Sequence, residues 1–496
     1  MFGFNKKKDN DLLAYIREGR EMTQHEKLKL IVQLSIPSVL AQLLTILMFF
    51  IDASMVGHLG AKEAASIGLV ESTSWLFGGL SSACSMGFSV QVAHAIGAND
   101  FERARNILRQ ALTCCLIFSC TLALIALCIY RPLPYWLGGG DDIAHDASLY
   151  FLIFSLAAPL FQLQSLCGSM LKCSGNMKVP SILNVLMCCM DVAFNYLFIF
   201  TLGMGVAGAA IGTSVAVLLT AGLMAYFLLW RSSMLGIFSR YEVRGTRYGN
   251  EDARYEVRDA RYDRGWAAFR PQSDTVSTAF KIGAPMGLQH LLMGGAQIVS
   301  TMIVAPLGNI SIAANTFAIT VESLCYMPGY GVAEAATTLV GQGIGAGQRL
   351  LTRSFARMSV SLGIGVMTLM GILMYIFAPE LMALMTPVEQ IRSLGAEVLR
   401  IEAFAEPMFA AAIVCNGVFI GAGDTLKPAI MSLCSMWGVR LTLAAWLARD
   451  HGLRGVWTAM AIELTFRGLL FLARLFHGSW AKDLSGESEL QHSGNS

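Results

Sequence analysis

Charged side chains are scarce in this chain of 496 residues: Asp, Glu, Lys and Arg make up 14% of it, against about 25% in soluble proteins. Hydrophobic residues make up 55%, and the mean hydropathy is +0.56. A soluble protein of this size cannot bury so much apolar surface. The 36 basic and 34 acidic residues nearly cancel, so the chain has no bulk charge for binding nucleic acid. Its 27 Phe, 26 Met and 48 Gly without a regular period exclude disorder and collagen.

Motifs of enzymes and metal sites are missing as well. The 12 cysteines lie in apolar stretches and include no C-x-x-C pair, which excludes a disulfide framework and a zinc site. The chain has no H-E-x-x-H, no G-x-S-x-G and no Walker lysine motif, and its eight histidines are scattered. We therefore expect neither an enzyme nor a bound cofactor. The polar N-terminus, with Lys6, Lys7 and Lys8, also argues against a cleavable signal peptide.

The chain is instead rich in long apolar runs. A bilayer core about 30 Å thick is crossed by about 20 apolar residues in a helix. Twelve runs of this length are present. Their approximate limits are 30–56, 65–93, 106–130, 147–171, 180–202, 206–230, 276–304, 312–340, 354–378, 396–420, 429–448 and 453–476.

The basic residues indicate how these runs are oriented. Most Lys and Arg fall in the two tails and in the segments after even-numbered runs. The opposite loops hold only Lys62, Arg131, Arg392, Arg449 and Arg454. Because cytoplasmic loops carry an excess of Lys and Arg, we expect a multi-pass protein of the plasma membrane with both termini cytoplasmic.

The two halves of the chain also repeat each other at an offset of 248 residues. The offset aligns Pro37 with Pro285, Ile96-Gly97-Ala98 with Ile344-Gly345-Ala346, Pro159 with Pro407, Gly175 with Gly423, and Pro180 with Pro428. Six runs in each half give both halves the same orientation, related by a pseudo-twofold axis along the membrane normal. We therefore predict an all-α integral membrane fold, with twelve transmembrane helices in two six-helix lobes around a central cavity. This is a transporter architecture.

The limits of the runs divide the chain into five parts. They are a cytoplasmic N-terminal tail (1–29), an N-lobe (30–230), a charged cytoplasmic linker (231–275), a C-lobe (276–477) and a cytoplasmic C-terminal tail (478–496). Residues 10–29 are typical of a weak helix that lies in the membrane interface. The linker contains the string RYEVR twice, at Arg240 and Arg254. It is either a solvated connection lengthened by duplication or a site for a regulatory partner or anionic headgroups.

Acidic side chains inside the N-lobe runs are the first functional candidates. An ionisable group near the bilayer centre costs about 2.5–3.5 kcal/mol on insertion scales, so each needs a reason. Asp52 lies near the outer end of the first run, and Asp191 and Asn195 share one face of the fifth. Their oxygens can jointly hold a proton or a hard cation, or each acid can simply pair with a donor at a helix end. Asp52 aligns with Ser300 and Asp191 with Val439, so the acids belong to one lobe only.

The C-lobe runs hold a different set of charges. Glu402 and Glu406, also spaced i and i+4, either begin a helix near the outer face or contribute with Glu322 to the substrate cavity. Arg440, Glu463 and Arg467 favour internal charge neutralisation, and Glu71 and Glu334 are further acids within spans.

Proline and glycine suggest two further features. Pro37 and Pro285 are expected to open the first and seventh helices, and a bend at Pro37 either converts protonation of Asp52 into a change of cavity shape or is a static kink. Gly341 to Gly347 looks like a phosphate loop, but it follows a transmembrane run and lacks the Lys-Ser/Thr pair. We interpret it as close packing at a helix end.

Four stretches resemble the multidrug and toxic compound extrusion (MATE) transporters. They are Phe50 to Gly60, Ala305 to Gly308, Gly341 to Gly347, and Gly421 to Pro428, the last echoed by Ser174 to Pro180. The resemblance runs from about Leu30 to Trp480. It implies export of amphipathic, often cationic compounds in exchange for Na⁺ or H⁺, by alternating access of two lobes.

The resemblance also implies which residues bind the coupling ion. The DinF-like branch has an Asp in helix 1, an Asn and Asp pair in helix 5 and a Thr in helix 6, which match Asp52, Asp191, Asn195 and Thr213. This chain reverses the order of the pair to Asp-x-x-x-Asn. The NorM-like branch also carries an acid in helix 7, whereas no acid occurs between Met286 and Val321 here. The cation site is therefore closer to the DinF-like than the NorM-like pattern, and Na⁺ would be held by Asp52 and Asp191.

The sequence thus predicts a secondary active multidrug exporter. The partners we expect are small drug-like molecules and the lipid bilayer, without nucleic acid, and the protein is expected to be a monomer. A flippase for a lipid-linked precursor is the alternative within transport, and it should line its cavity with Arg and Lys. A membrane-embedded transferase would need a His and acid constellation that we do not find.

Overall fold

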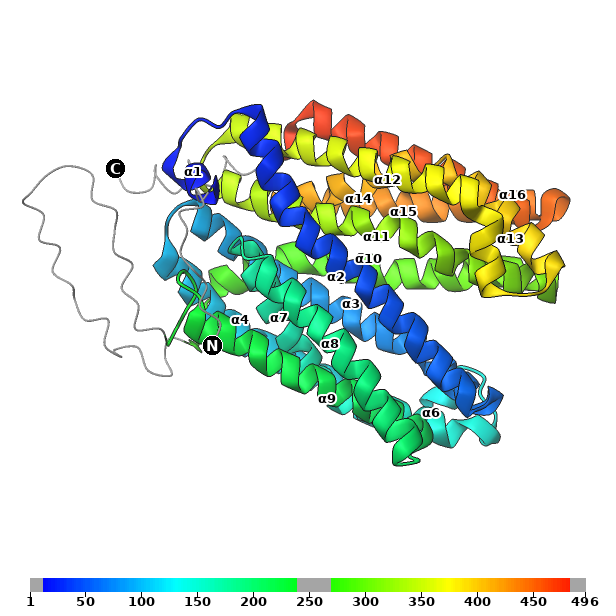
Figure 1. Ribbon diagram of the computed structural model, residues 1–496. Helices are drawn as coiled ribbons and strands as arrows, with labels where there is room; N and C mark the ends of the chain where they lie inside the picture. The colour runs from blue at the N-terminus through cyan, green and yellow to red at the C-terminus, as the bar shows by residue number, and fades with distance from the viewer. Residues whose placement is uncertain (1–11, 239–268, 482–496) are drawn as a thin grey trace, which may run out of the picture.

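The computed structural model describes residues 12–238 and 269–481, and this part of the chain is helical without strands (Figure 1). The six N-lobe spans are α2 (Gln24–Leu59), α3 (Ala61–Gly97), α4 (Phe101–Ile129), α6 (Asp141–Leu156) with α7 (Ala158–Cys173), α8 (Lys178–Tyr196) with η1 (Leu197–Thr201), and α9 (Gly205–Tyr226) with η2 (Phe227–Arg231). The C-lobe begins with α10 (Ser273–Val304), α11 (Asn309–Gly345), α12 (Arg349–Met385), and α13 (Glu389–Ala403) with α14 (Glu406–Gly421). It ends with α15 (Leu426–Cys434), η5 (Ser435–Arg440) and α16 (Leu441–His477). The short elements are α1 (Leu12–Glu18), α5 (Leu133–Trp136), η4 (Ala305–Leu307) and η6 (Ser479–Ala481).

The last two spans are joined within one long helical stretch. Gly452 has a non-helical backbone inside α16, with φ 56° and ψ −136°. It separates the span that α15 begins from the span that reaches His477. The predicted twelve-helix fold is confirmed.

Two spans are bent at equivalent places in the two lobes. The bend is 46° between α6 and α7 and 59° between α13 and α14. Pro159 and Pro407, which the repeat aligns, each lie at the start of the second helix of the pair. Proline fits the first turn of a helix but cannot continue a preceding one, so the sequence repeat produces the same break twice.

The prediction that Pro37 and Pro285 open their helices is wrong. Helix α2 begins at Gln24 with a capping box, in which Thr23 accepts from the Glu26 amide and the Glu26 carboxylate accepts from the Thr23 amide. Helix α10 likewise begins at Ser273, so each proline lies inside its helix. The helices run beyond the apolar window because capping and packing at the membrane surface stabilise a polar first turn as well.

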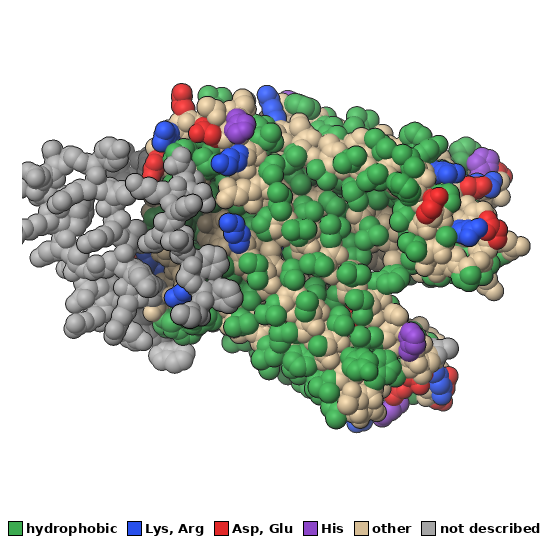
Figure 2. All heavy atoms as spheres, in the orientation of Figure 1, with side chains coloured by type: hydrophobic (Ala, Val, Ile, Leu, Met, Phe, Trp, Pro, Cys, Tyr) green, Lys and Arg blue, Asp and Glu red, His purple; other side chains and the backbone are tan. Residues whose placement is uncertain are grey.

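The two lobes meet at one end of the molecule and part at the other. Figure 1 shows α1 at the closed end, and Figure 2 shows the lobes separating at the opposite end. Hydrophobic side chains cover the side of the molecule in this view, while charged ones gather at its two ends (Figure 2). This distribution is that of a membrane protein whose apolar belt contacts lipid.

Glycines of the repeat bring the lobes together at the closed end. A Cβ atom on Gly97 would lie 2.1 Å from the Gln342 carbonyl oxygen, and one on Gly345 would lie 2.0 Å from the His94 carbonyl oxygen. Two equivalent hydrogen bonds cross beside them: His94 Nε2 to the Gly421 carbonyl at 2.9 Å, and Gln342 Nε2 to the Cys173 carbonyl at 2.8 Å. All these pairs are related by the offset of 248. The interpretation of Gly341 to Gly347 as close packing at a helix end is confirmed.

The N-terminal helix is not the surface helix that the sequence predicts. Ile16 of α1 is fully buried, and Leu12 and Met22 are nearly so. They pack with Ala335 of the C-lobe and Leu34 of the N-lobe. The apolar face of this segment therefore covers the junction between the lobes, because the closed end offers it an apolar surface.

The remaining predictions on the tails and the linker fall mainly outside the described residues. Residues 1–11, 239–268 and 482–496 are not described, and both copies of RYEVR lie among them. The described flanks are η2, which ends at Arg231, and α10, which begins at Ser273.

Candidate functional site

Three helices of the N-lobe bring the predicted acids together. The Asn195 side-chain nitrogen Nδ2, on α8, donates to Asp191 Oδ2 one turn earlier at 3.1 Å. The same nitrogen donates to Asp52 Oδ1 on α2, also at 3.1 Å. Thr213 of α9 lies beside the Asp191 carboxylate. All four residues predicted to form the cation site therefore meet in one place.

This N-lobe site is buried and has free oxygen atoms. Asp191 is fully buried, Asn195 is 3% exposed, and Asp52 is partly exposed. Asp191 Oδ1 and Asn195 Oδ1 accept no hydrogen bond. A buried acceptor without a partner costs about 1–3 kcal/mol, and carboxylate and amide oxygens are the atom types that bind a proton or a hard cation.

A glycine makes room for the amide at this site. A Cβ atom on Gly212 of α9 would lie 2.2 Å from Asn195 Oδ1. Any other residue at this position would therefore displace the side chain that joins the two acids. The approach of α9 to α8, which also places Thr213, depends on this glycine.

No basic side chain neutralises the N-lobe acids. Within the described parts of the chain, neither Asp52 nor Asp191 forms an ion pair. The same parts contain no group of three or more His, Cys, Asp or Glu that could hold a metal ion. Two carboxylates, an amide and a hydroxyl form an oxygen set that suits Na⁺ or a proton, and not a transition metal.

The C-lobe acids are also buried, but they lie among arginines. Glu402 and Glu406 are fully buried and Glu322 is 6% exposed. Glu402 lies within electrostatic range of Glu322, Glu406 and Arg440. Arg467 forms an ion pair with Glu463, with Nε 2.9 Å from Oε1, which confirms the predicted charge neutralisation for this pair.

Not every C-lobe carboxylate is satisfied. Glu463 also accepts from Ser435 Oγ at 2.7 Å, whereas both oxygens of Glu402 and of Glu406 accept no hydrogen bond. Glu322, Glu402 and Glu406 lie in the interior of the C-lobe and do not line the cavity between the lobes. Their role in a substrate cavity stays a prediction.

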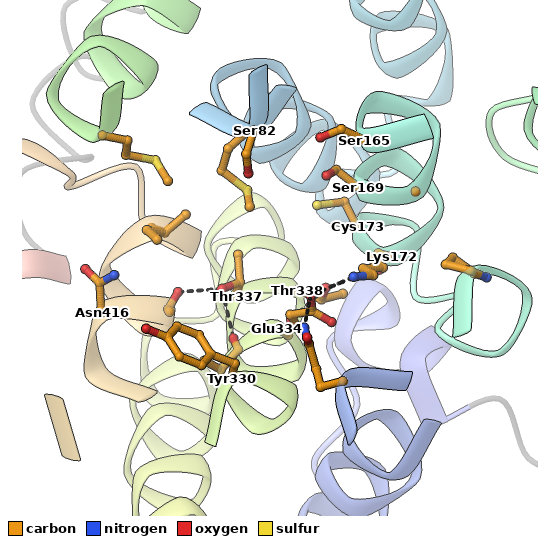
Figure 3. Close-up of a pocket in the computed structure, with 18 of the residues that line it drawn as sticks. Ser82, Ser165, Ser169, Lys172, Cys173, Tyr330, Glu334, Thr337, Thr338 and Asn416 are labelled. Carbon is orange, nitrogen blue, oxygen red and sulfur yellow. Dashed lines mark hydrogen bonds and ion pairs between the residues drawn. The ribbon is translucent and has the colours of Figure 1, made fainter. Parts of the chain in front are cut away.

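The central cavity has a volume of about 550 Å³ and is lined by both lobes. Its polar lining includes Ser165, Ser169 and Lys172 of α7 and Tyr330, Glu334, Thr337 and Thr338 of α11 (Figure 3). Phe161, Met86, Met224 and Met286 contribute apolar surface. Aromatic and methionine side chains adapt to different ligand shapes, and this volume is typical of sites for drug-sized molecules.

Sequence reasoning missed Lys172 and assigned no role to Glu334. Lys172 Nζ lies 2.6 Å from Glu334 Oε1 across the lobes. The sequence did contain a signal for Lys172, because Ser165, Ser169 and Lys172 form a polar stripe at i, i+4 and i+7 on a mostly apolar helix. Such a stripe marks a face turned away from lipid.

Helix α2 connects the cavity with the N-lobe site. Gln42 lines the cavity and donates to Glu334 Oε1 at 3.4 Å, and Asp52 follows ten residues later, about 15 Å along the axis. Pro37 lies inside this same helix. Its role as a bend stays a prediction.

Known proteins share this architecture. The family model MatE matches residues 37–197 and 285–446, one match in each lobe. A protein of Thermotoga maritima named "Probable multidrug resistance protein NorM" is 25% identical over 465 residues, which cover 92% of this chain and 93% of that protein.

Solved structures show the same fold. A structure described as "Crystal structure of MATE in complex with MaL6" has a TM-score of 0.83 at 21% identity, covering 95% of this chain and 99% of the other. An "Outward-facing conformation of a multidrug resistance MATE family transporter of the MOP superfamily" has a TM-score of 0.82 at 22% identity, covering 92% and 97%.

Proposed function

Since the chain belongs to the MATE family, whose members are transporters and not enzymes, we propose that it is a secondary active exporter. It exchanges amphipathic, often cationic compounds for Na⁺ or H⁺. The chain is a multi-pass membrane protein, and the name of the Thermotoga maritima relative supports drug-like molecules as substrates.

The observation that carries the proposal is the buried carboxylate pair of the N-lobe. Asp52 and Asp191 share one amide donor, Asn195, and have no basic partner among the described residues. Two unneutralised acids in a region of low polarity repel each other, so binding one proton or one Na⁺ stabilises the pair. In this mechanism Asn195 and Thr213 complete the oxygen shell.

We further propose that this cation site is of the DinF-like kind. The four matching residues lie together in the N-lobe, and α10 has no acid from Met286 to its end at Val304. The relative named NorM is similar over the whole chain, so overall similarity does not decide the subtype. The coupling ion is the only non-protein component that the mechanism requires.

Alternating access would use the two ends of the cavity. The lobes meet through Gly97 and Gly345 at the end where α1 lies, and they part at the other (Figure 2). The positive-inside pattern supports a cytoplasmic closed end, and the described conformation would then be open to the outside. Asp52 lies seven residues from the open end of α2, where ions from outside can reach it.

The test is cation-driven efflux by purified protein in liposomes. Asp52→Asn should abolish ethidium or norfloxacin efflux driven by an imposed Na⁺ or H⁺ gradient, each gradient applied alone. Glu71→Gln is the matched control, because Glu71 is an exposed acid of the same lobe whose one hydrogen bond among the described residues is accepted from Trp75. Full gradient-driven efflux by Asp52→Asn would refute the coupling mechanism.

The flippase alternative finds less support in the cavity. A lipid pyrophosphate requires several basic residues, whereas the charged residues of the lining are Lys172 and Glu334, which pair with each other. The exporter therefore remains the better proposal.

A further inference from the structure

The charges of the central cavity cancel within one ion pair. Among the described residues, Lys172 and Glu334 are the only Lys, Arg, Asp or Glu that line it, and they come from different lobes. Their side chains are 21% and 26% exposed, so both face the cavity and neither is sealed from it. Figure 3 shows the pair among the hydroxyl groups of α7 and α11.

The pair has unused hydrogen-bonding capacity. Lys172 and Gln42 both donate to Oε1 of Glu334, and among the described residues Oε2 accepts no hydrogen bond. The Lys172 ammonium donates once, to Glu334, although it carries three hydrogens. A ligand can therefore add to either charge before the pair separates.

The free energy of replacing this ion pair by contacts to a ligand depends on the charge of the ligand. A partly exposed ion pair contributes only about 0–1 kcal/mol, so separating its members costs little if each finds a new partner. Leaving one charge unpaired in a half-buried site costs about 1–3 kcal/mol. A simple cation that displaces Lys172 from Glu334 leaves Lys172 unpaired, and a simple anion that displaces Glu334 from Lys172 leaves Glu334 unpaired.

A zwitterion avoids this cost. Its carboxylate accepts from Lys172 while its ammonium donates to Glu334, so one internal ion pair is replaced by two intermolecular ones. Its apolar body then lies against Phe161 and the methionines Met86, Met224 and Met286. We propose that Lys172 and Glu334 together select zwitterionic amphiphiles over cations of the same shape. This inference rests on the proposed export function and names its preferred substrate class.

The experiment compares two ligands that differ in one charge. Norfloxacin, a zwitterion near neutral pH, and its ethyl ester, a cation, are titrated into purified full-length protein in detergent, and binding is followed by fluorescence anisotropy. The wild type should bind norfloxacin about tenfold more tightly than the ester. Equal affinity for the two, or binding of neither, would overturn the proposal.

Variants of Lys172 and Glu334 test whether this ion pair causes the preference for norfloxacin over its ester. Lys172→Met should weaken norfloxacin binding about tenfold and strengthen binding of the ester, because Glu334 is released. Glu334→Gln should weaken both ligands. The double variant Lys172→Glu with Glu334→Lys should restore the preference for norfloxacin. Lys178→Met, which removes an exposed Lys outside the cavity, is the matched control and should change nothing.

A purely structural role of the pair gives a different result. If Lys172 only ties the lobes together, Lys172→Met changes the affinity for both ligands by the same factor, and the proposal fails. Because binding is measured in detergent without an ion gradient, the measured affinities do not depend on ion-coupled transport. A wild type that shows no charge preference but retains gradient-driven efflux refutes this inference alone. Full gradient-driven efflux by Asp52→Asn, with the preference for norfloxacin intact, refutes the coupling mechanism alone.

Discussion

The acid clusters of the two lobes differ in how their charges are balanced. In the N-lobe, Asp52 and Asp191 share an amide and have no basic partner in the described structure. In the C-lobe, Glu463 is paired with Arg467, and Arg440 lies near Glu322 and Glu402. The repeat preserved prolines and glycines but not these charges. The lack of counter-charges supports the proposed ion site in the N-lobe, whereas an acid paired with an arginine can be structural.

The largest expected effect comes from removing the second N-lobe acid. Asp191→Asn should reduce gradient-driven efflux to the level of empty liposomes, because a neutral amide cannot exchange a proton or bind Na⁺ strongly. The melting temperature in detergent should stay the same or rise, since a buried uncompensated charge is removed. Gradient-driven efflux by Asp191→Asn at the wild-type rate would contradict the proposal that the N-lobe acids, unlike those of the C-lobe, bind the coupling ion.

Removing the C-lobe acid Glu463 should lower the stability of the protein. Glu463→Gln leaves Arg467 without its carboxylate partner in a site where their side chains are 0% and 11% exposed. Breaking such a buried pair costs about 3–5 kcal/mol, so the melting temperature should fall clearly. Removing both charges, by Glu463→Gln with Arg467→Met, should recover most of the loss. A single variant as stable as the wild type would contradict a structural role.

Enlarging the equivalent glycine of either lobe should weaken the contact between the lobes at the closed end to the same extent. Gly97→Ala and Gly345→Ala each place a Cβ atom against the backbone of the other lobe. Overpacking of this kind costs about 1–3 kcal/mol, so both should speed hydrogen–deuterium exchange in residues 94–100 and 341–348. Gly78→Ala is the control, because its Cβ would meet nothing within 4 Å. An effect at only one position would show that the two contacts are not equivalent.

The smallest expected effect tests the geometry of the N-lobe site. Gly212→Ala brings a Cβ atom against Asn195 Oδ1 and should displace the amide without removing a charge. The apparent affinity for the coupling ion should fall about tenfold, which corresponds to one lost hydrogen bond, with the maximal efflux rate retained. Gly222→Ala on the same helix faces open space and serves as the control. An unchanged ion dependence would exclude Asn195 from the ion shell.

Much of the N-lobe site was predictable because its parts are local. Asp191 and Asn195 are one helical turn apart, so their shared face follows from the sequence alone. Asp52 is an acid within the first apolar run, and the resemblance to known transporters joined it to this pair and added Thr213. The pair of Lys172 and Glu334 was not predictable, because its members lie 162 residues apart in different lobes and meet only when the lobes approach.

The sequence by itself determined the twelve spans and the internal repeat, because span hydrophobicity is a property of short segments. Only the tertiary structure decided that α1 covers the junction between the lobes, that Glu322, Glu402 and Glu406 lie outside the central cavity, and that Lys172 meets Glu334. The physical reason is that lipid surrounds apolar helix faces as readily as protein does. Helix partners in a membrane are therefore chosen by close packing and polar contacts between distant segments, which periodicity does not encode.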